Sequence, residues 1–333
     1  MRIGEGITLR LAARNTMNGI AKVIGARLGQ AVMVAWLIAT LNFTFVHVLP
    51  GDLAFRIAVT RIGGERVNVQ IVERIRHEEG LDRPIAVQYA QWMGRLMTLD
   101  LGRSLVTRRP VTEELADHAR YTLALGVIGW LLSYLIALPL GIAAGFRPNG
   151  VIDRAATGFA VALASLPSFL VGIGLISVFA LTLRWLPPAG FRSAEHMVLP
   201  AVTLALSLAA FSIPIIRNAI IEVRSAFFMT FARIKGLSAA HAFRSHGVRN
   251  AAIPVTTFAA LQFAFVIDGF VIIETLFNYP GLGDLLIKSL MARDVPIIMG
   301  VGLVIGLLYA IINLAADLLC LKLDPRRAAR VTA

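Results

Sequence analysis

The sequence is poor in charged residues and almost lacks cysteine. Asp, Glu, Lys and Arg make up 16% of its 333 residues, whereas soluble domains carry about 25%. Hydrophobic residues make up 57% of the chain, and the mean hydropathy is +0.74. The single cysteine, Cys320, excludes an internal disulfide and a multi-cysteine metal site. This composition excludes a soluble globular enzyme and indicates a polytopic membrane protein.

Three motifs of catalytic and nucleotide-binding proteins are also missing. The sequence contains no G-x-x-x-x-G-K-[ST] loop for ATP and no G-x-S-x-G turn for a nucleophilic serine. His77 and Glu78 are not followed by a second histidine at the spacing of a zinc site. We therefore predict that the chain is not an enzyme and binds neither metal nor cofactor itself.

Acidic residues are scarce, so the formal net charge is +12. A strongly basic balance can indicate nucleic-acid binding, but in a membrane protein it more often reflects basic cytoplasmic loops. The longest polar segment, residues 50–120, holds eleven Arg and ten Asp or Glu, which nearly cancel. A nucleic-acid surface of one sign is therefore not expected there.

Six apolar runs dominate the rest of the chain, and each has about the length that crosses a bilayer as a helix. They lie at residues 31–49, 122–146, 156–183, 197–216, 255–277 and 295–321. The runs are too long and continuous for the alternating strands of an outer-membrane barrel. The first is also too long for a secretory signal and lacks a cleavage site, although Met17 offers a second possible start. We predict an all-α membrane protein with six transmembrane helices.

The distribution of basic residues predicts the orientation of these helices. With the N-terminus inside, the inside segments hold 17 Lys or Arg and the short outside loops hold 4. Cytoplasmic loops carry this kind of excess, while a loop as long as residues 50–120 is translocated regardless of its charge. Both termini are therefore predicted to be cytoplasmic, with residues 50–120 outside.

The outside segment is predicted to contain two helices. The dipeptide Pro50-Gly51 ends the first span. The stretch 68–79 has helical periodicity, and Pro84 opens a second helix. The apolar faces of these two helices comprise Ile71, Val72 and Ile75, and then Ile85, Tyr89, Trp92, Met93 and Leu96.

Small residues and prolines mark special positions in the spans. Gly141 and Gly145, like Gly302 and Gly306, have the spacing that lets membrane helices pack closely. Prolines in or beside spans break or kink helices. They stand at Pro139, Pro167, Pro200 and Pro214.

Three carboxylates fall within the predicted spans: Asp268, Glu274 and Asp317. Ionisable groups in the bilayer are costly and are functional candidates by default. Asp268 lies deepest, and it either faces a water-filled translocation path or forms a hydrogen bond between helices. Glu274 is a second candidate for the path, although it and Asp317 lie nearer the span ends, where a structural role is favoured.

The stretch from 226 to 254 is basic and contains no acid. Ser225 is predicted to cap a short helix that carries Phe227, Phe228, Phe231 and Ile234 and ends at Gly236. Ser238 then caps a second helix that runs toward Asn250, and Pro254 stands near the start of the fifth span. Such a loop is either a docking surface for a cytoplasmic partner or an amphipathic helix on anionic lipid.

At these residues the sequence resembles the inner-membrane permease subunits of binding-protein-dependent ABC importers. The coupling loop of that family reads E-A-A, then glycine, and ends in Ile/Leu-Pro. Here residues 230–232 read T-F-A, so that only the last alanine is kept, while Gly236 and Ile253-Pro254 match. Residues 231–237, F-A-R-I-K-G-L, are close to the T-A-R-x-K-G-L of dipeptide permeases.

Further stretches resemble the dipeptide, oligopeptide and nickel branch, in order from about residue 30 to 327. They are L-P-G-D at 49–52, G-L-D-R-P at 80–84 with Q-Y at 88–89, D-L-G-R-S at 100–104, E-T-L-F at 274–277, P-G-L-G at 280–283 and R-D-V-P at 293–296. Each motif alone is weak, but together and in order they are a specific signal.

The resemblance implies a type I ABC importer permease fold in the bacterial inner membrane, with a periplasmic subdomain after the first helix. The chain then divides into a cytoplasmic segment (1–29), helix 1 (30–49), the periplasmic subdomain (50–120), a permease core with helices 2–6 (121–321, coupling loop 218–254) and a cytoplasmic tail (322–333).

The implied partners are a homologous second permease, expected to form a heterodimer, two cytoplasmic ATPases that use the ATP, a periplasmic substrate-binding protein and membrane lipid. The ATPases would dock on Phe231, Ala232, Arg233, Lys235, Gly236 and Leu237. Cargo in this branch includes peptides, nickel, glutathione and oligosaccharides.

Two other classes of function compete with the permease. A self-sufficient secondary transporter or channel needs its own coupling-ion site, for which only Asp268, Glu274 and Asp317 are available. An intramembrane enzyme needs a paired nucleophile and base within the spans, and the sequence offers no evident pair.

Overall fold

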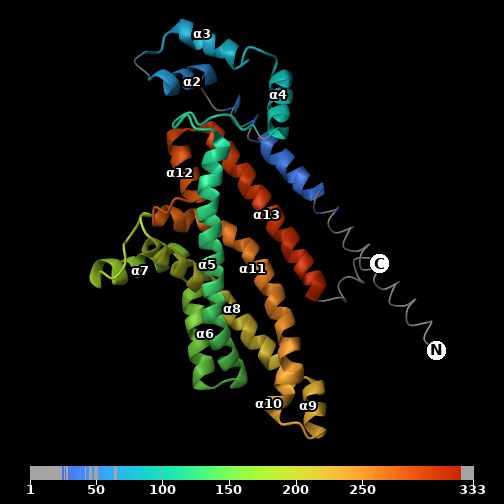
Figure 1. Cartoon of the computed structure of the whole chain (residues 1–333). Helices are drawn as coiled ribbons and strands as arrows, with labels where there is room; N and C mark the ends of the chain where they lie inside the picture. Colours follow the sequence, from blue (N-terminus) through green and yellow to red (C-terminus); the bar gives the residue numbers. More distant parts are fainter. Residues whose placement is uncertain are drawn as a thin grey trace, which may run out of the picture. The chain divides into compact units, whose positions relative to one another are not determined.

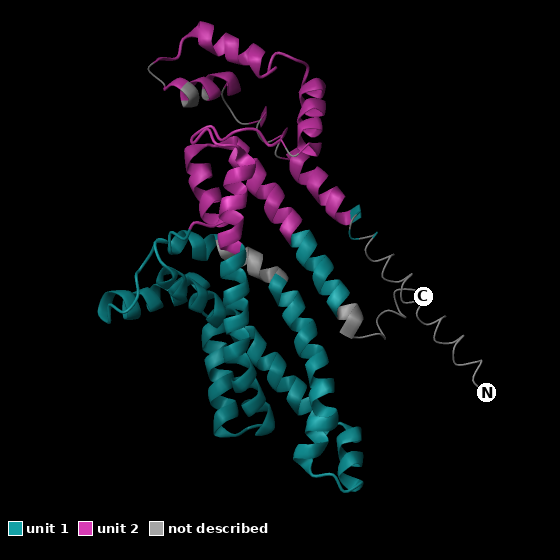
Figure 2. Ribbon diagram, viewed as in Figure 1, with its two compact units in different colours: residues 1–29, 123–279, 309–333 teal, residues 30–122, 280–308 magenta. Residues whose placement is uncertain are grey.

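The computed structural model describes residues 25, 27, 29–41, 43–44, 47–48, 52–63, 66–98 and 100–323, without the side chains of 56, 60–61, 264–270 and 320–323. The chain forms two compact units (Figure 2). Unit 1 comprises Leu123–Tyr279 with both terminal regions, and unit 2 comprises Gln30–Thr122 and Pro280–Leu308. All regular elements within the described residues are helical, which confirms the predicted all-α class.

Unit 1 is built around α8 (Val198–Ser225), whose apolar stretch is largely buried (Figure 1). Helices α6, α7 and α11 pack directly against α8. The bounds of the neighbouring elements are α5 Val111–Phe146, α6 Val151–Ala164, α7 Ser168–Leu175, the π-helical η2 Ile176–Thr182, the 3₁₀ turn η3 Ala194–Met197, α9 Phe227–Ile234, α10 Ala239–Ala242, the π-helical η4 Phe243–Gly247, α11 Val248–Leu276 and α13 Val295–Leu323. Helices α5 and α13 contribute residues to both units.

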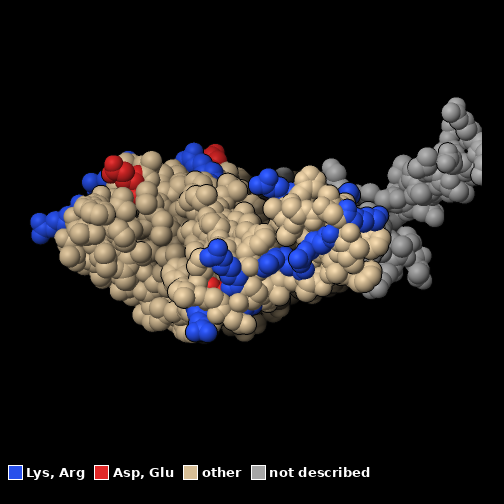
Figure 3. Space-filling view, turned by 90° about the horizontal axis from the view of Figure 1, so that it is seen from below, with Lys and Arg blue, Asp and Glu red and all other residues tan. Residues whose placement is uncertain are grey.

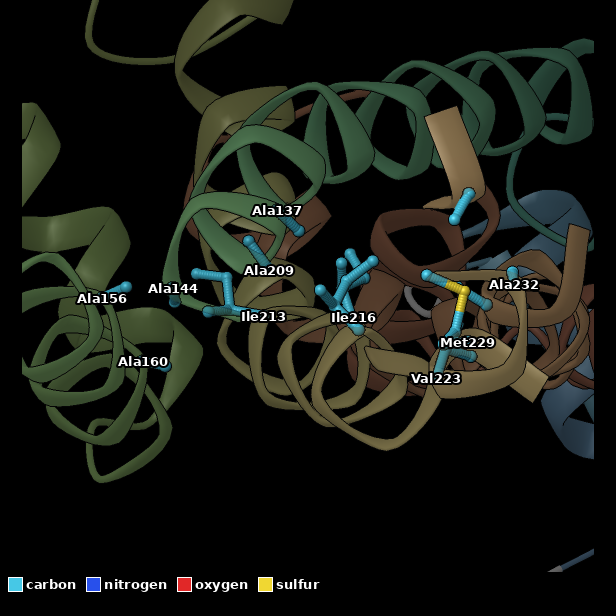
Figure 4. Packing of buried hydrophobic residues seen from close by; sticks show 13 residues of the cluster. Ala137, Ala144, Ala156, Ala160, Ala209, Ile213, Ile216, Val223, Met229 and Ala232 are labelled. Carbon is cyan, nitrogen blue, oxygen red and sulfur yellow. The ribbon is translucent and has the colours of Figure 1, made fainter. Parts of the chain in front are cut away.

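The core of unit 1 depends on small residues at the contact of α5 with α8. A Cβ at Gly141 would lie 2.7 Å from Cβ of Ile216, and one at Gly145 would lie 2.6 Å from Cβ of Ile220. Neither distance leaves room for a side chain, so only glycine permits this approach. The close packing predicted from the Gly141–Gly145 spacing is therefore confirmed. Figure 4 shows the surrounding cluster, in which Ala137 and Ala144 of α5 lie among Ile213 and Ile216 of α8.

The predicted span at 156–183 is not one continuous helix. Helix α6 ends at Ala164, and α7 begins after Pro167 and continues into η2. The two parts are bent by 104°. Pro167 has no N–H for an intrahelical bond and its ring clashes with the preceding turn, which explains the break. Pro139 and Pro214, in contrast, lie inside α5 and α8.

Three described helices are long and apolar enough to cross a membrane, or four if the bent pair forms one span. They are Val111–Phe146, Ala194–Ser225 and Val295–Leu319, with the pair at 151–182. The first predicted span coincides with the apolar helix Gly29–Leu41, and the fifth coincides with α11, whose side chains at 264–270 are not described. The count of six spans stays a prediction.

Unit 2 contains the helices of the predicted outside segment. Asn68 caps α3 (Val69–Glu78) by accepting a hydrogen bond from the N–H of Ile71, and Pro84 precedes α4 (Ile85–Met97). Both predicted helices are confirmed, but Ile85 is 63% exposed and does not belong to the packed face of α4. The sequence analysis missed α2 (Leu53–Ile62) and α12 (Leu282–Ala292).

Two cores stabilise unit 2. Ala54, Ile57 and Ala58 of α2 pack on Ile75 of α3, and Ile71 and Val72 adjoin them as predicted. A larger core joins the start of α5 to α12 and α13 through Val111, Leu115, Leu282, Leu285, Ile297 and Val301. Gly306 of α13 approaches the first helix so closely that a Cβ there would meet Cδ1 of Ile38 at 2.4 Å.

A buried carboxylate ties the loop before α5 to the start of α13. Asp294 accepts hydrogen bonds from the hydroxyl of Ser104 and from the N–H of Leu105, the latter at 3.0 Å. The N–H of Val106 lies 3.4 Å from the same carboxylate. Two of the sequence motifs, at 100–104 and 293–296, are thereby joined across 190 residues of chain. We name Ser104, Leu105, Val106 and Asp294 the Asp294 clamp.

Candidate coupling site

The basic loop leaves α8 through an abrupt change of backbone direction. Ala226 is extended, with φ −66° and ψ 144°, and stands at the N-cap of α9 without a side-chain hydrogen bond. The prediction that Ser225 caps this helix is wrong. Ser225 is the last residue of α8, and its hydroxyl donates back to the carbonyls of Ile221 and Glu222.

The end of α9 follows the prediction at Gly236. This residue has φ +90°, a conformation that side chains disfavour. The N–H of Gly236 donates to the carbonyl of Arg233 at 3.0 Å, and the N–H of Leu237 donates to the carbonyl of Ala232 at 3.2 Å. This pair of bonds is a Schellman motif, which satisfies the last carbonyls of a helix and turns the chain sharply. The next residue, Ser238, caps α10 by accepting from the N–H of His241, also as predicted.

Helix α9 is amphipathic, and much of its apolar surface faces outward. Met229 and Ala232 are buried in the core of unit 1 and anchor the helix. Phe227, Phe231 and Ile234 follow each other at helical spacing and are 80%, 47% and 75% exposed. We name these three residues the outer stripe. An anchored helix with an exposed apolar stripe is suited to contact with another apolar surface.

Exposed cations lie on the same loop as the outer stripe. Arg233, Lys235, Arg244 and Arg249 are all exposed, and none forms an ion pair in the part of the chain that the structure describes. The ammonium of Lys235 lies 4.6 Å from the ring centroid of Phe231, close enough for a cation–π contact. Figure 3 shows unit 1 from this end, where Lys and Arg far outnumber Asp and Glu.

The second helix of the loop differs from the prediction. Helix α10 passes through η4 directly into α11, and the prediction of a separate helix ending near Asn250 is wrong. Pro254 consequently lies inside α11 rather than at its start. The backbone therefore stays helical from Ala239 to Leu276, with a π-helical stretch at Phe243–Gly247.

Two of the basic residues counted in the predicted inside segments, Arg224 and Arg217, form hydrogen bonds within unit 1. Arg224 donates to the carbonyls of Gly145 and Phe146, the former at 3.2 Å, and so satisfies the C-terminal end of α5. Its guanidinium lies 5.1 Å from the centroid of the Phe146 ring, which also contacts Phe243 at 4.9 Å. The ends of α5 and α8 and the turn η4 are thereby held together next to the loop.

Arg217 is the second of these residues. It donates to both carboxylate oxygens of the buried Asp153, with Nη2 and Oδ2 2.7 Å apart. The N–H of Asn149 and the hydroxyl of Thr157 also donate to Asp153. This pair joins α6 to α8. The sequence signal that could have pointed to this pair is Asp153, an acidic residue in the first turn of a helix, three residues after Gly150.

The structure places the predicted path residues only in part. Glu274 is fully buried near the end of α11. The side chain of Asp268 lies outside the described residues. Asp317 forms an ion pair with Arg27 at 2.5 Å, in agreement with the structural role favoured for it. Among the described residues, no three His, Cys, Asp or Glu side chains are placed to hold a metal ion.

Comparisons with known proteins match most of the chain to components of transport systems. Residues 137–329 match the family described as "Binding-protein-dependent transport system inner membrane component", and residues 20–126 match its N-terminal counterpart. The chain is 38% identical over 289 residues to the glutathione transport system permease protein GsiC of Salmonella choleraesuis (strain SC-B67), covering 87% of this chain and 93% of that protein. It is 37% identical over 299 residues to the protein of that name from Escherichia coli (strain K12), covering 90% and 96%.

A solved structure supports the fold. The MetNI methionine ABC transporter, in inward-facing conformations, contains a chain that matches with a TM-score of 0.54 and 16% identity. The match covers 63% of this chain and 96% of that chain. At this level of identity the likeness concerns the fold alone.

Proposed function

This chain belongs to the family of inner-membrane components of binding-protein-dependent transport systems, and from that premise we propose that its segment 226–254 is the docking site for the ATPase subunits of an importer. The chain is a membrane permease subunit of an ABC importer of the peptide and nickel branch, and it is not an enzyme. Its family implies separate ATPase and substrate-binding partners.

The observation that carries the proposal is the outer stripe on a firmly anchored helix. Met229 and Ala232 fix α9 to the core of unit 1, while Phe231 and Ile234 remain exposed. In the proposed contact the stripe enters an apolar groove of the ATPase. Arg233 and Lys235 meet acidic groups at its rim, where charges steer association. Ala232, Gly236 and Leu237 shape the helix end rather than supply contact energy.

The alternative role for this segment is an amphipathic helix that lies on anionic lipid. The capping geometry favours docking to the ATPase rather than this lipid-binding role. A helix that binds a membrane surface needs no fixed exit angle, whereas the Schellman motif at Gly236 and the cap at Ser238 fix both ends of the turn. In the proposal, ATP binding brings the docked ATPases together. The continuous α10–η4–α11 segment carries that motion into the bundle.

The remaining topology is also proposed. The chain crosses the membrane six times with both termini in the cytoplasm, and the segment 50–120 lies outside, where it faces the substrate-binding protein. A homologous permease completes the path as a heterodimer, and two ATPases use the ATP, so that this chain itself binds no cofactor. Asp268 is proposed to face the path, whereas the complete burial of Glu274 favours a structural role for it.

The proposed cargo is a short peptide or glutathione. The chain matches the relatives named for glutathione transport over 93% and 96% of their length. The match therefore includes the permease core that surrounds the proposed path. The motifs of the dipeptide branch support the same class of cargo.

Replacing Phe231 and Ile234 together by Asp tests the docking site. Both side chains are exposed, so the fold should persist, but charges on the outer stripe cannot enter an apolar groove. The amount of ATPase that co-purifies with the chain should fall by at least about tenfold, because central apolar contacts dominate such interfaces. The measurement is quantitative mass spectrometry of the complex after gentle purification.

Val69→Asp is the matched control, because Val69 is 83% exposed on α3 of unit 2. Its complex should contain the ATPases at the unaltered level. An undiminished ATPase content in the Phe231→Asp/Ile234→Asp variant would refute the docking site.

A further inference from the structure

Unit 2 contains a groove between the end of α3 and one face of α4. Its volume is about 470 Å³. Gln91 and Arg95 of α4 and the C-cap residue Thr98 follow each other at helical spacing along one side of the groove. The complete lining is Glu78, Glu79, Gly80, Arg83, Gln91, Gly94, Arg95 and Thr98.

The two walls of the groove are fixed by hydrogen bonds of the turn that joins them. Gly80 has φ +65°, and the N–H of Leu81 donates to the carbonyl of Arg76 at 2.9 Å. The side-chain amide of Gln88 donates to the carbonyls of Leu81 and Arg83, at 3.1 and 2.7 Å. The turn therefore holds the start of α4 beside the end of α3, and the groove is preformed.

A smaller chamber continues from the groove toward the first helix. It has a volume of about 120 Å³ and shares Glu79, Gln91 and Arg95 with the groove. Its other walls are mainly apolar and aromatic, and they are formed by Phe43, His47, Leu81, Gln88, Trp92 and Met299.

Trp92 forms part of the wall of this chamber. Its indole N–H is buried and has no hydrogen-bond partner among the described residues. His47 on another wall is held by the carbonyl of Phe43 at 2.8 Å and by Oε1 of Gln88 at 3.1 Å. A buried donor without a partner costs free energy unless a bound molecule accepts from it.

Charges of both signs line the outer groove. Arg83 and Arg95 are exposed, and neither guanidinium is paired with a carboxylate within the described part of unit 2. Glu78 and Glu79 stand on the opposite wall, at the end of α3. Two acids disfavour a phosphate or another simple anion, and two guanidinium groups disfavour a simple cation. A molecule with one anionic and one cationic group can pair with the guanidinium groups on one wall and with the carboxylates on the other.

We propose that this groove binds a short zwitterionic peptide, with its carboxylate on Arg83 and Arg95, its ammonium group near Glu78 and Glu79, and one side chain in the chamber lined by Phe43 and Trp92. Guanidinium groups bind carboxylates through paired, charge-assisted hydrogen bonds. The choice of a peptide rests on the proposed function as an importer of such cargo. The groove gives this permease a site of its own for the cargo, separate from the predicted path at Asp268.

Gly94 allows the groove to be filled without disturbing the fold. A Cβ at this position would meet no atom within 4 Å, and Gly94 lines the groove. Gly94→Leu therefore places a branched side chain in the groove, whereas Gly94→Ala leaves most of the space open. Both changes raise helix propensity, so neither is expected to unfold α4.

The test is binding of the dipeptide Ala-Phe to the full chain, purified with its partner subunits in lipid nanodiscs without the substrate-binding protein and without ATP. We expect Gly94→Leu to weaken binding at least about tenfold and Gly94→Ala to leave it within about twofold, as measured by titration calorimetry. Amidation of the peptide carboxylate should weaken binding to the unaltered chain by about tenfold and have little effect on the Arg95→Gln variant.

Equal affinity of the Gly94→Leu variant and the unaltered chain would overturn the proposal, as would the absence of binding up to about 10 mM peptide. The ATPase content of the same preparations separates this outcome from failure of the proposed docking site. Loss of peptide binding in Gly94→Leu with a normal ATPase content supports the groove. Normal ATPase content in the Phe231→Asp/Ile234→Asp variant refutes the dock and leaves the groove unaffected.

Discussion

The α9 segment of unit 1 and the Asp294 clamp of unit 2 are held in place by opposite means. Met229 and Ala232 anchor α9 through apolar contacts, and the Schellman motif at Gly236 satisfies the C-terminal end of the helix. In the clamp, a buried carboxylate accepts hydrogen bonds from Ser104 and Leu105. Apolar contacts are non-directional, whereas bonds to a buried carboxylate fix direction as well as distance. The first arrangement suits a segment that moves with a partner, and the second suits a fixed loop.

Removing the carboxylate of the clamp should have the largest effect on stability. Asp294→Ala leaves the O–H of the buried Ser104 and the part-buried N–H of Leu105 without an acceptor, and each such group costs about 1–3 kcal/mol. We expect the free energy of unfolding to fall by about 4 kcal/mol. Equilibrium unfolding of the purified chain in mixed micelles measures this change.

Asp117→Ala provides the control for the clamp, because it removes a carboxylate of the same unit that is exposed. Asp117 lies 2.9 Å from Arg109, and the two side chains are 43% and 49% exposed. Exposed pairs of this kind contribute at most about 1 kcal/mol. If both variants lost the same free energy of unfolding, the Asp294 clamp would stabilise unit 2 no more than an exposed ion pair does.

Unit 1 also contains a buried carboxylate held by directional hydrogen bonds, Asp153, which pairs with Arg217. This pair allows the same kind of interaction to be compared between the two units. Arg217→Met leaves the carboxylate of Asp153 buried with only Asn149 and Thr157 as donors. Breaking a buried pair from one side costs about 3 kcal/mol. The expected result is a loss of that size in the same unfolding measurement.

The double variant Asp153→Leu/Arg217→Met should recover most of this stability, because no charge then remains buried. Failure to recover would mean that the pair contributes to stability beyond compensating its own desolvation. In that case unit 1 would depend on directional bonds as strongly as unit 2.

Local signals in the sequence predicted some helix ends correctly, although the predicted cap at Ser225 and the predicted helix end near Asn250 were wrong. Asn68, Pro84, Gly236 and Ser238 each act through backbone groups within a few residues, and the structure places all four at helix termini. The packed face of α3 could also be predicted from the sequence, because Ile71, Val72 and Ile75 repeat at helical spacing.

Pairings between distant residues could not be predicted from the sequence. Ser104 and Asp294 are 190 residues apart, and Asp153 and Arg217 are 64 apart, so no local spacing connects them. For the same reason, Arg217 could only be counted among the 17 Lys and Arg of the predicted inside segments, without its partner Asp153. Helix α2 was missed because its hydrophobic residues are interrupted by Arg56 and Arg61, although Asp52 caps it in the usual way.

The smallest predicted effect distinguishes the two serines that flank α9 in the sequence, Ser225 at the end of α8 and Ser238 before α10. Ser238 caps α10 by accepting from the N–H of His241, so Ser238→Ala should cost about 1 kcal/mol. The hydroxyl of Ser225 donates to carbonyls that are already within α8, so Ser225→Ala should change stability by less than about 0.5 kcal/mol. The local effect is measured by amide hydrogen exchange of residues 238–247 in the purified complex.

Faster exchange in Ser238→Ala alone would support a turn whose geometry is fixed at Gly236 and Ser238. Equal protection in both variants would mean that apolar anchoring by Met229 and Ala232 suffices to order the segment. The coupling of ATPase motion to α11 would then depend on the buried side of α9 rather than on its caps.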